Sequence, residues 1–237
     1  MRVTREHILV SNRNKRRIKK ESINFFGLLY DAKEPSRPEK IKAIDHLQAP
    51  ESKKELQEFL GIATYLSPFI PNLSSHTSSL RNMIKKDAKF EWQQSHQDAS
   101  EHIKQLICRD MTLSYFDPGK QTTLQVDASM SGHGAVLMQD AKPIYFASRS
   151  LTDTEQRYAN IERELLAVVI ACEKFHMYVY GKEFIVESDH KPLEMIYLKI
   201  LVATPTRLQR MLLRLQGYQL KITVHTSQGK QCCWQML

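Results

Sequence analysis

The spacing of apolar and polar residues changes near position 110. Beyond it, Thr122–Ser129 (TTLQVDAS) alternates and is rich in β-branched residues, which predicts a strand. Gly132–Met138 and Lys142–Ser148 predict two more strands, and Asp140-Ala141 between them suits a hairpin turn. The second part of the chain therefore begins with three consecutive strands.

After these strands, helical and strand patterns alternate. Thr152 suits the cap of a long helix, with Glu155 completing a capping box. The expected helices are Thr152–Tyr178, Lys191–Leu198 and Pro205–Leu215, and the expected strands are Glu183–Ser188 and Gln219–His225. The predicted order is βββ-α-β-α-β, in the α+β or α/β class.

Before position 110 the apolar spacing is mostly helical. Leu56, Phe59 and Leu60 recur on one face of a helix that follows the separator Pro50-Glu51-Ser52. Pro38 suits the first turn of an earlier helix. Two further amphipathic helices are expected near Ser78–Lys86 and Ser95–Cys108, and a short strand-like run lies in INFFGLLYD.

These changes divide the chain into three expected segments. They are a basic N-terminal segment (1–36), a small helical domain (37–110) and a domain with the strands (111–237). The net charge of the chain is +8, of which the first 20 residues carry +7, so the remainder is not strongly basic. The basic segment is either a nucleic-acid contact or a solvated arm.

Composition excludes some classes of protein. The chain has 237 residues and 42% hydrophobic content, which is ordinary for a globular protein. Its longest strongly apolar run, Leu165–Cys172, is too short to span a bilayer, and no signal peptide opens the chain, so we expect an intracellular protein. The 4 cysteines show no C-x-x-C spacing, and Cys172 is expected in the core.

Three acidic residues stand where strands and the long helix meet. Asp127 ends the first strand, Glu164 lies inside the helix, and Asp189 follows the fourth strand. Each alone is ordinary, since an Asp after a strand is commonly a turn residue. Glu164 abuts an apolar run, however, and Glu162 can take the solvent-facing role. Carboxylates that converge repel one another unless cations lie between them, and Mg²⁺ prefers such oxygen ligands.

The residues around these acids resemble a known family. LQVDASMSGHGAVLMQ and the stretch from PIYFASRS to ESDHKPL resemble the RNase H domain of gypsy-type LTR-retrotransposon polymerases. The preceding FFGLLYD, PEKIKAI and KKELQEFLGIATYLSPFIPN resemble the thumb and connecting segment of the same polyproteins. The resemblance runs from about Ser22 to Lys230 and implies an RNase H-like domain with a mixed five-stranded sheet.

The resemblance also implies a chemistry. Asp127, Glu164 and Asp189 match three of the family's four metal-binding carboxylates, which hold two Mg²⁺ ions, for which Mn²⁺ can substitute. The implied reaction is hydrolysis of the RNA strand of an RNA–DNA hybrid. Arg149, Lys191 and Arg207 are candidates for gripping the hybrid, with a solvated surface as the alternative for each. His190 is a candidate for assisting proton transfer or product release, with a structural role as the alternative.

The sequence departs from the family in two ways. No Tyr-x-Asp-Asp sequence occurs, so we expect the palm and fingers of a polyprotein to be a separate partner and this chain not to polymerise DNA. The family's segment after the last strand, of the type ADALSR, carries the fourth carboxylate, and GKQCCWQML stands here instead. We therefore expect weak or absent cleavage, and the alternative is a catalytically dead nucleic-acid-binding or scaffold remnant.

The genetic code suggests a cause for the altered tail. Reading from the third base of the Gln231 codon permits Met-Leu-Leu-Ala-Asp-Ala, which fits the family pattern. We hypothesise a one-base frameshift after Lys230, and sequencing of the gene tests it, because an intact out-of-phase ADALSR frame should follow. The adjacent Cys232 and Cys233 are then an accident of the frame rather than a metal or redox site.

Overall fold

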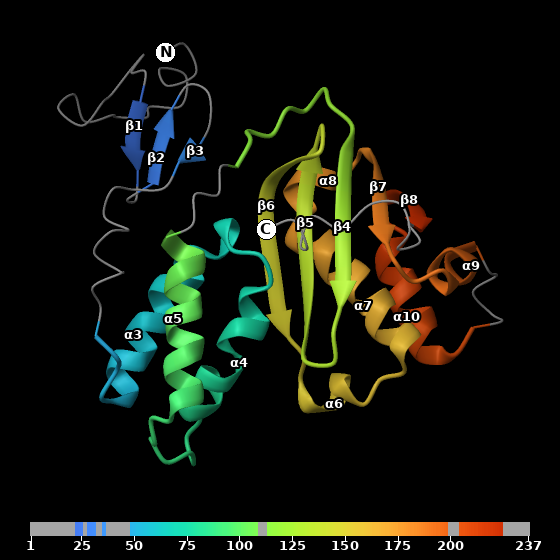
Figure 1. Cartoon of the computed structure of the whole chain (residues 1–237). Coiled ribbons are helices and arrows are strands. Elements are labelled where there is room, and N and C mark those ends of the chain that lie inside the picture. Colours follow the sequence, from blue (N-terminus) through green and yellow to red (C-terminus); the bar gives the residue numbers. More distant parts are fainter. Residues whose placement is uncertain are drawn as a thin grey trace, which may run out of the picture.

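A group of helices and a helix-covered sheet follow one another along the chain (Figure 1). The structure, a computed structural model, describes residues 48–108, 113–198 and 204–224, together with three short strands near the N-terminus. The expected helix at Pro38, the basic segment Met1–Lys20 and the tail after Val224 lie outside the described residues. In the part that is described, no helix is both long and apolar enough to cross a membrane.

The three short strands form an antiparallel sheet in the order β1-β2-β3. Ser22 pairs with Asp31 and Phe25 with Leu28, so the strand-like run in INFFGLLYD folds as two strands rather than one. The strands are β1 (Ser22–Phe25), β2 (Leu28–Asp31) and β3 (Pro35–Ser36).

The helical unit comprises α3 (Lys53–Tyr65), η3 (Ser67–Phe69), α4 (Leu73–Met83) and α5 (Gln94–Cys108). The hydroxyl of Ser52 accepts the backbone N–H of Glu55 and caps α3, as N-terminal serines do. The helices pack around the apolar side chains of Leu56, Phe59, Leu60, Leu80, Ile103 and Ile107.

The prediction for the second helix of this unit was wrong at its start, because α4 begins at Leu73 rather than at Ser78. Its first turns are rich in serine, so no apolar periodicity marks them. The buried Thr77 hydroxyl donates to the Leu73 carbonyl at 2.9 Å, which lets a polar residue occupy the inner face.

The second unit is built on a five-stranded sheet in the order β6-β5-β4-β7-β8. β4 pairs antiparallel with β5 and parallel with β7, so the sheet is mixed as expected. Asp140 and Ala141 adopt φ angles of 51° and 59°, the left-handed geometry of the predicted two-residue hairpin. The strands are β4 (Thr122–Ala128), β5 (Gly132–Gln139), β6 (Lys142–Ser150), β7 (Glu183–Ser188) and β8 (Gln219–Val224).

The long helix predicted at Thr152–Tyr178 is interrupted. It is divided into α6 (Asp153–Gln156), α7 (Asn160–Lys174) and α8 (His176–Val179). The capping box of Thr152 and Glu155 is present at the start of α6. A second start follows, because the Glu162 carboxylate accepts the backbone N–H of Ala159 at 3.0 Å and caps α7.

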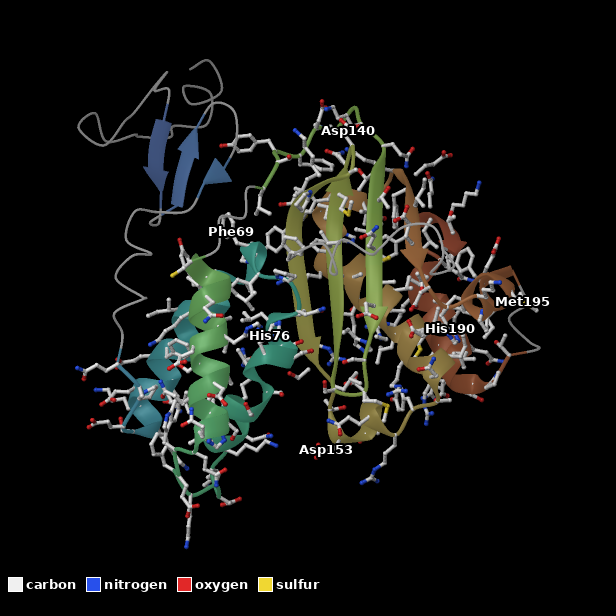
Figure 2. The ribbon with its side chains drawn as sticks, viewed as in Figure 1. Phe69, His76, Asp140, Asp153, His190 and Met195 are labelled. Carbon is white, nitrogen blue, oxygen red and sulfur yellow. The ribbon has the colours of Figure 1, made fainter. Side chains whose placement is uncertain are left out.

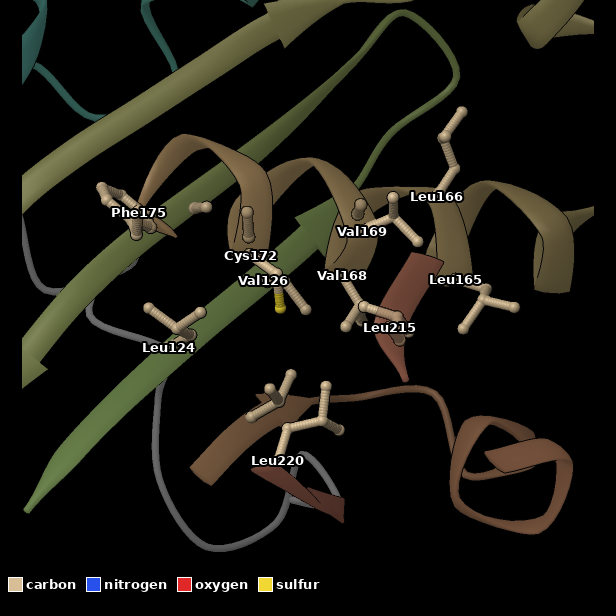
Figure 3. Close-up of a cluster of buried hydrophobic side chains, with 14 of the residues drawn as sticks. Leu124, Val126, Leu165, Leu166, Val168, Val169, Cys172, Phe175, Leu215 and Leu220 are labelled. Atoms are coloured by element: carbon tan, nitrogen blue, oxygen red, sulfur yellow. The ribbon is translucent and has the colours of Figure 1, made fainter. Parts of the chain in front are cut away.

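The core of this unit lies between one face of the sheet and the helices α7, α9 (Pro192–Leu198) and α10 (Thr206–Leu215). Figure 3 shows Cys172 of α7 beside Val126 of β4, and Val168 of α7 beside Leu215 of α10. The run Leu165–Cys172 is therefore a buried helix, and burial raises the pKa of the Cys172 thiol to about 12, so Cys172 is a core residue as predicted.

The helical unit packs on the other face of the sheet. Phe69 of η3 reaches toward β6 (Figure 2) and is buried with Leu113, Val136, Met138 and Phe146. The Ser74 backbone N–H also donates to the Ser148 hydroxyl at 2.9 Å. The two faces of the sheet thus hold two separate apolar clusters.

The close approach of α4 to the sheet depends on Gly132. A Cβ atom here would lie 3.0 Å from both the Arg149 carbonyl oxygen and the Ser74 hydroxyl. We therefore expect Gly132→Ala to lower the free energy of unfolding by about 1–3 kcal/mol, the usual cost of overpacking. Chemical denaturation measures this change.

Gly61 provides the matched control. It lies in the interior of α3, and a Cβ there meets nothing within 4 Å. Gly61→Ala should stabilise the chain by about 0.5–1 kcal/mol, since alanine is the better helix former. If Gly132→Ala instead proved as benign as Gly61→Ala, α4 would not rest on the sheet this closely.

Candidate active site

Asp127 is the penultimate residue of β4 and lies beside the edge where β4 and β7 end. Its side chain is partly buried. Burial and the nearby negative charge of Asp189 raise the pKa of its carboxyl, while a hydrogen bond from the Ala128 backbone opposes that shift. Asp127 thus lies close enough to Asp189 for the two carboxylates to repel each other.

Glu164 comes to this edge from α7, the helix beneath the sheet. It is only 4% exposed, and its Oε2 has no hydrogen-bond partner in the described part of the chain. Burial, followed by the charges of Asp189 and Asp127, raises the pKa of its carboxyl to about 8, against the opposing charge of Arg163. A buried, unpaired carboxyl of this kind is costly unless a positive charge compensates it.

Glu162 contrasts with Glu164, although its side chain is 13% exposed rather than solvated as the sequence predicted. Both of its carboxylate oxygens accept from Arg207 Nη1, at 2.9 and 2.8 Å. Two residues along the helix are enough to separate a surface ion pair from a buried acid.

Asp189 follows β7 directly and is exposed. Because β4 and β7 are adjacent parallel strands, their carboxyl ends meet at the same edge of the sheet. The charge of Asp189 acts on both other acids, which places the three in one electrostatic cluster. Among residues 48–108, 113–198 and 204–224, however, no three His, Cys, Asp or Glu side chains are arranged to hold a metal ion.

His190 and Lys191 follow the cluster in sequence. The His190 backbone N–H donates to the Ser188 hydroxyl at 3.2 Å, and its ring Nδ1 lies 3.4 Å from the amide nitrogen of Asn160 (Figure 2). The Lys191 side chain is exposed. Both residues therefore lie beside the carboxylates and at the surface, where a substrate could reach them.

Arg149 and Arg207 are held by acidic partners instead. Arg149 Nη2 donates to the Glu155 carboxylate at 2.6 Å. Arg207 pairs with Glu162 and stacks over the Tyr158 ring, with its guanidinium carbon 4.2 Å from the ring centroid. These contacts give each arginine a structural role, whatever part it has in binding a substrate.

A cation that the sequence did not single out lies in the interruption between α6 and α7. Arg157 is exposed and lines an open depression with Met130, Ser131, Asp153 and Gln156. No side-chain ion pair joins Arg157 to another described residue. The sequence did not indicate Arg157 because it predicted a continuous helix here. The break between α6 and α7 makes this segment a surface loop next to the β4–β5 hairpin.

Comparisons with known proteins agree with this architecture. Residues 92–186 match the family described as "RNase H-like domain found in reverse transcriptase". Among solved structures, a foamy viral protease-reverse transcriptase in complex with RNA/DNA hybrid superposes with a TM-score of 0.76 at 21% identity, covering 90% of this chain and 30% of that one. This likeness shows the shared fold.

Two curated relatives come from Drosophila melanogaster. The Pol polyprotein from transposon 297 is 40% identical over 208 residues, which are 86% of this chain and 19% of the relative. The Pol polyprotein from transposon gypsy is 34% identical over 196 residues, which are 77% of this chain and 19% of the relative. The chain thus spans about a fifth of the length of these relatives. It carries a reverse-transcriptase RNase H-like domain and is a homologue of the Pol polyproteins of gypsy-type retrotransposons.

Proposed function

We propose that this chain is an RNase H-type endoribonuclease of low activity, acting on the RNA strand of RNA–DNA hybrids. The observation that carries the proposal is the buried Glu164 carboxyl, whose pKa is raised to about 8 by burial and two neighbouring acids. Such strongly perturbed groups concentrate at functional sites. The hybrid named for the foamy viral structure supports the choice of substrate.

The cluster fits a divalent cation in its chemistry. An orphaned carboxylate oxygen on Glu164 and mutual repulsion among three acids are both relieved by a hard cation with oxygen ligands. Asp127, Glu164 and Asp189 are the residues that would hold Mg²⁺, or Mn²⁺ in its place. Two such ions, when bound, activate an attacking water and stabilise the leaving oxygen of a phosphodiester.

The surrounding residues supply substrate binding in this proposal. The exposed Lys191, two residues after Asp189, and the exposed Arg157, beside the loop between β4 and β5, offer positive charge to backbone phosphates. His190, next to Asp189 in the chain, would assist proton transfer or product release. Arg149 and Arg207 contribute charge only in part, because their acidic partners already neutralise them.

Low activity follows from the altered tail. The family's fourth carboxylate is missing from GKQCCWQML, so one of the four ligands expected for the two metal ions is lost. Polymerisation is assigned to the palm and fingers of a polyprotein, since the chain has no Tyr-x-Asp-Asp sequence. The rival proposal, a scaffold that binds nucleic acid without cleaving it, draws on the same loss and on the absence of a preformed metal arrangement among the described residues.

A cleavage assay on four proteins tests the function. They are the chain itself, the chain with Met-Leu-Leu-Ala-Asp-Ala-Leu restored after Gln231, and the Asp127→Asn variant of each. We expect weak Mg²⁺-dependent cleavage of a hybrid by the first and at least about a 10-fold gain in the second, since loss of metal-supporting groups costs that much or more. Both Asp127→Asn variants should be inactive, and cleavage that persists in them would refute the site.

Thermal unfolding separates the nuclease from the scaffold. A ligand present at 100 times its Kd stabilises the fold by about 2.7 kcal/mol, so millimolar Mg²⁺ should raise the Tm of a chain that binds it. Stabilisation that disappears in Asp127→Asn favours the nuclease. Hybrid binding without any Mg²⁺-dependent change in Tm or cleavage favours the scaffold.

A further inference from the structure

A row of three polar side chains leads from α7 to His190. Arg163 Nη2 donates to Asn160 Oδ1 at 3.1 Å, and the amide nitrogen of Asn160 lies 3.4 Å from His190 Nδ1. Figure 2 shows His190 beside the start of α7, the turn to which Asn160 belongs. Arg163 precedes Glu164 in the chain and His190 follows Asp189, so each end of the row adjoins one acid of the cluster.

Arg163 is the buried end of this row. It is 8% exposed, and within the part of the chain that the structure describes no carboxylate forms an ion pair with it. Its Nη1 donates to the sulfur of Met130 and its Nη2 to Asn160. A guanidinium is rarely buried without an acidic partner, because the charge must give up its water. This cost indicates that Arg163 has a task at the site.

The orientation of the Asn160 amide follows from its contact with Arg163. A guanidinium can only donate hydrogen bonds, so the amide atom that faces it must be the oxygen. The amide nitrogen, which can also only donate, is then left to face His190. His190 Nδ1 must therefore accept, and the proton of the neutral ring lies on Nε2.

The backbone of His190 is held as well. Its N–H donates at 3.2 Å to the hydroxyl of Ser188, which is 4% exposed at the end of β7. The His190 ring is half-buried, and no described residue bonds to its Nε2. The fold thus engages the backbone and Nδ1 of His190 and leaves the Nε2–H group available to a substrate.

We propose that Arg163 and Asn160 are positioning residues that hold His190 in the Nε2–H tautomer, from which it donates a hydrogen bond to a phosphate oxygen of the hybrid or of its cleaved product. A phosphate oxygen only accepts, which suits this N–H group. A general base would need a free lone pair, and this tautomer has one only at Nδ1, where Asn160 occupies it. His190 therefore keeps its proton, and its role is to assist product release rather than to abstract a proton. The use of Nε2–H on a substrate rests on the proposed nuclease function, whereas the tautomer does not.

Nitrogen-15 NMR of the histidine rings tests the positioning in the metal-free chain, without any cleavage. At about pH 9 imidazole is neutral, and the shifts of its two nitrogens show which of them carries the proton. We expect His190 to be mainly the Nε2–H tautomer. Asn160→Asp keeps the shape of the side chain but offers His190 an acceptor in place of a donor. The ratio of Nε2–H to Nδ1–H should then fall at least about 5-fold, since one hydrogen bond is lost and the opposite one is gained.

A second variant and an internal control accompany this change. Arg163→Met removes the group that orients the amide and should also lower the share of Nε2–H. His176 should keep its signals in every variant, because its Nδ1 lies 2.9 Å from the Tyr218 hydroxyl, away from Asn160. Asn160 is exposed and an aspartate suits the first turn of a helix, so Asn160→Asp should fold and decides alone if Arg163→Met does not. An unchanged His190 tautomer in Asn160→Asp would overturn the proposal.

Cleavage kinetics distinguish this proposal from the nuclease proposal. The suitable background is the chain with Met-Leu-Leu-Ala-Asp-Ala-Leu restored after Gln231. There, the uncharged change Asn160→Ala should lower kcat for a hybrid roughly 2- to 10-fold, the worth of one hydrogen bond, and change KM less. A loss confined to KM, or no loss, would overturn the use of Nε2–H in the reaction. A tautomer that responds as expected in a chain that cleaves no hybrid would refute the nuclease and support the positioning.

Discussion

Glu164→Gln is expected to make the metal-free protein more stable at pH 9 by roughly 3–5 kcal/mol, the linkage equivalent of the raised pKa, while abolishing Mg²⁺-dependent cleavage. The variant keeps the size of the side chain and removes its charge. Because Glu164 is buried with two other acids nearby, the charged form is the unfavourable one, and its removal relieves the fold.

The pH dependence has a definite sign. The pKa of Glu164 is about 8 in the folded chain, whereas the ordinary value for a glutamate is 4.5. Between pH 4.5 and pH 8 the folded state therefore keeps a proton that the unfolded state has lost. The free energy of unfolding therefore falls as pH rises from about 4.5 to about 8. The variant should match the unsubstituted chain below pH 4.5, exceed it by a growing margin up to about pH 8 and keep that margin above, as measured by chemical denaturation in the presence of a chelator.

In the presence of Mg²⁺ the unsubstituted chain should be more stable than Glu164→Gln. The ion compensates the negative charge of Glu164, and the variant has lost that charge and binds the ion less well. Glu162→Gln is the matched control on the same helix, and it should show neither effect, because Glu162 caps Ala159 and pairs with Arg207 at the surface. A Glu164→Gln variant with unchanged stability at every pH would mean that the three acids do not repel one another as inferred.

Phe69→Ala is expected to lower the free energy of unfolding by about 3–5 kcal/mol, the usual cost of emptying a buried phenylalanine site. Phe69 is 3% exposed and fills the cluster that joins η3 to the sheet. Its loss should also uncouple the two units, so that the helices melt before the sheet. Trp92 fluorescence, recorded in a Trp234→Phe background because the chain has 2 tryptophans, reports on the helical unit, and circular dichroism reports on the whole chain.

Phe175→Ala is the control for Phe69→Ala. Phe175 is 1% exposed but packs in the core between α7 and the sheet, away from the helical unit. Both changes should cost a similar amount, yet only Phe69→Ala should separate the two melting signals. Coincident transitions in both variants would show that the cluster around Phe69 does not join the units.

The sheet and its hairpin could be predicted from the sequence because their signals are local. Alternation with β-branched residues marks β4, and Asp140-Ala141 has the chain geometry of a tight turn. The burial of Glu164 could also be anticipated, since it adjoins the apolar run of α7, whereas Glu162, two residues earlier, lies on a different side of the helix and pairs with Arg207. These features depend on neighbours in the chain.

What could not be predicted depends on contacts between distant residues. Nothing in LTDTEQRYAN marks the break before Asn160, because its residues also suit a continuous helix, and the cap of Ala159 by Glu162 exists only once the helix is broken. The pairing of Arg207 with Glu162 joins residues 45 positions apart, so the sequence could only suggest a free arginine. The contact of Asn160 with His190 likewise joins residues 30 positions apart.

The parallel pairing of β4 with β7 also bears on the order of folding events. β4 and β5 are joined by a short loop, whereas Gln125 of β4 meets Glu187 of β7 across 62 positions. Contacts of high sequence separation close late, because loop entropy must be lost before they form. Asp189 joins the other two acids only when β7 pairs, so the proposed affinity for divalent ions would be acquired by a refolding or newly synthesised chain in its last stages.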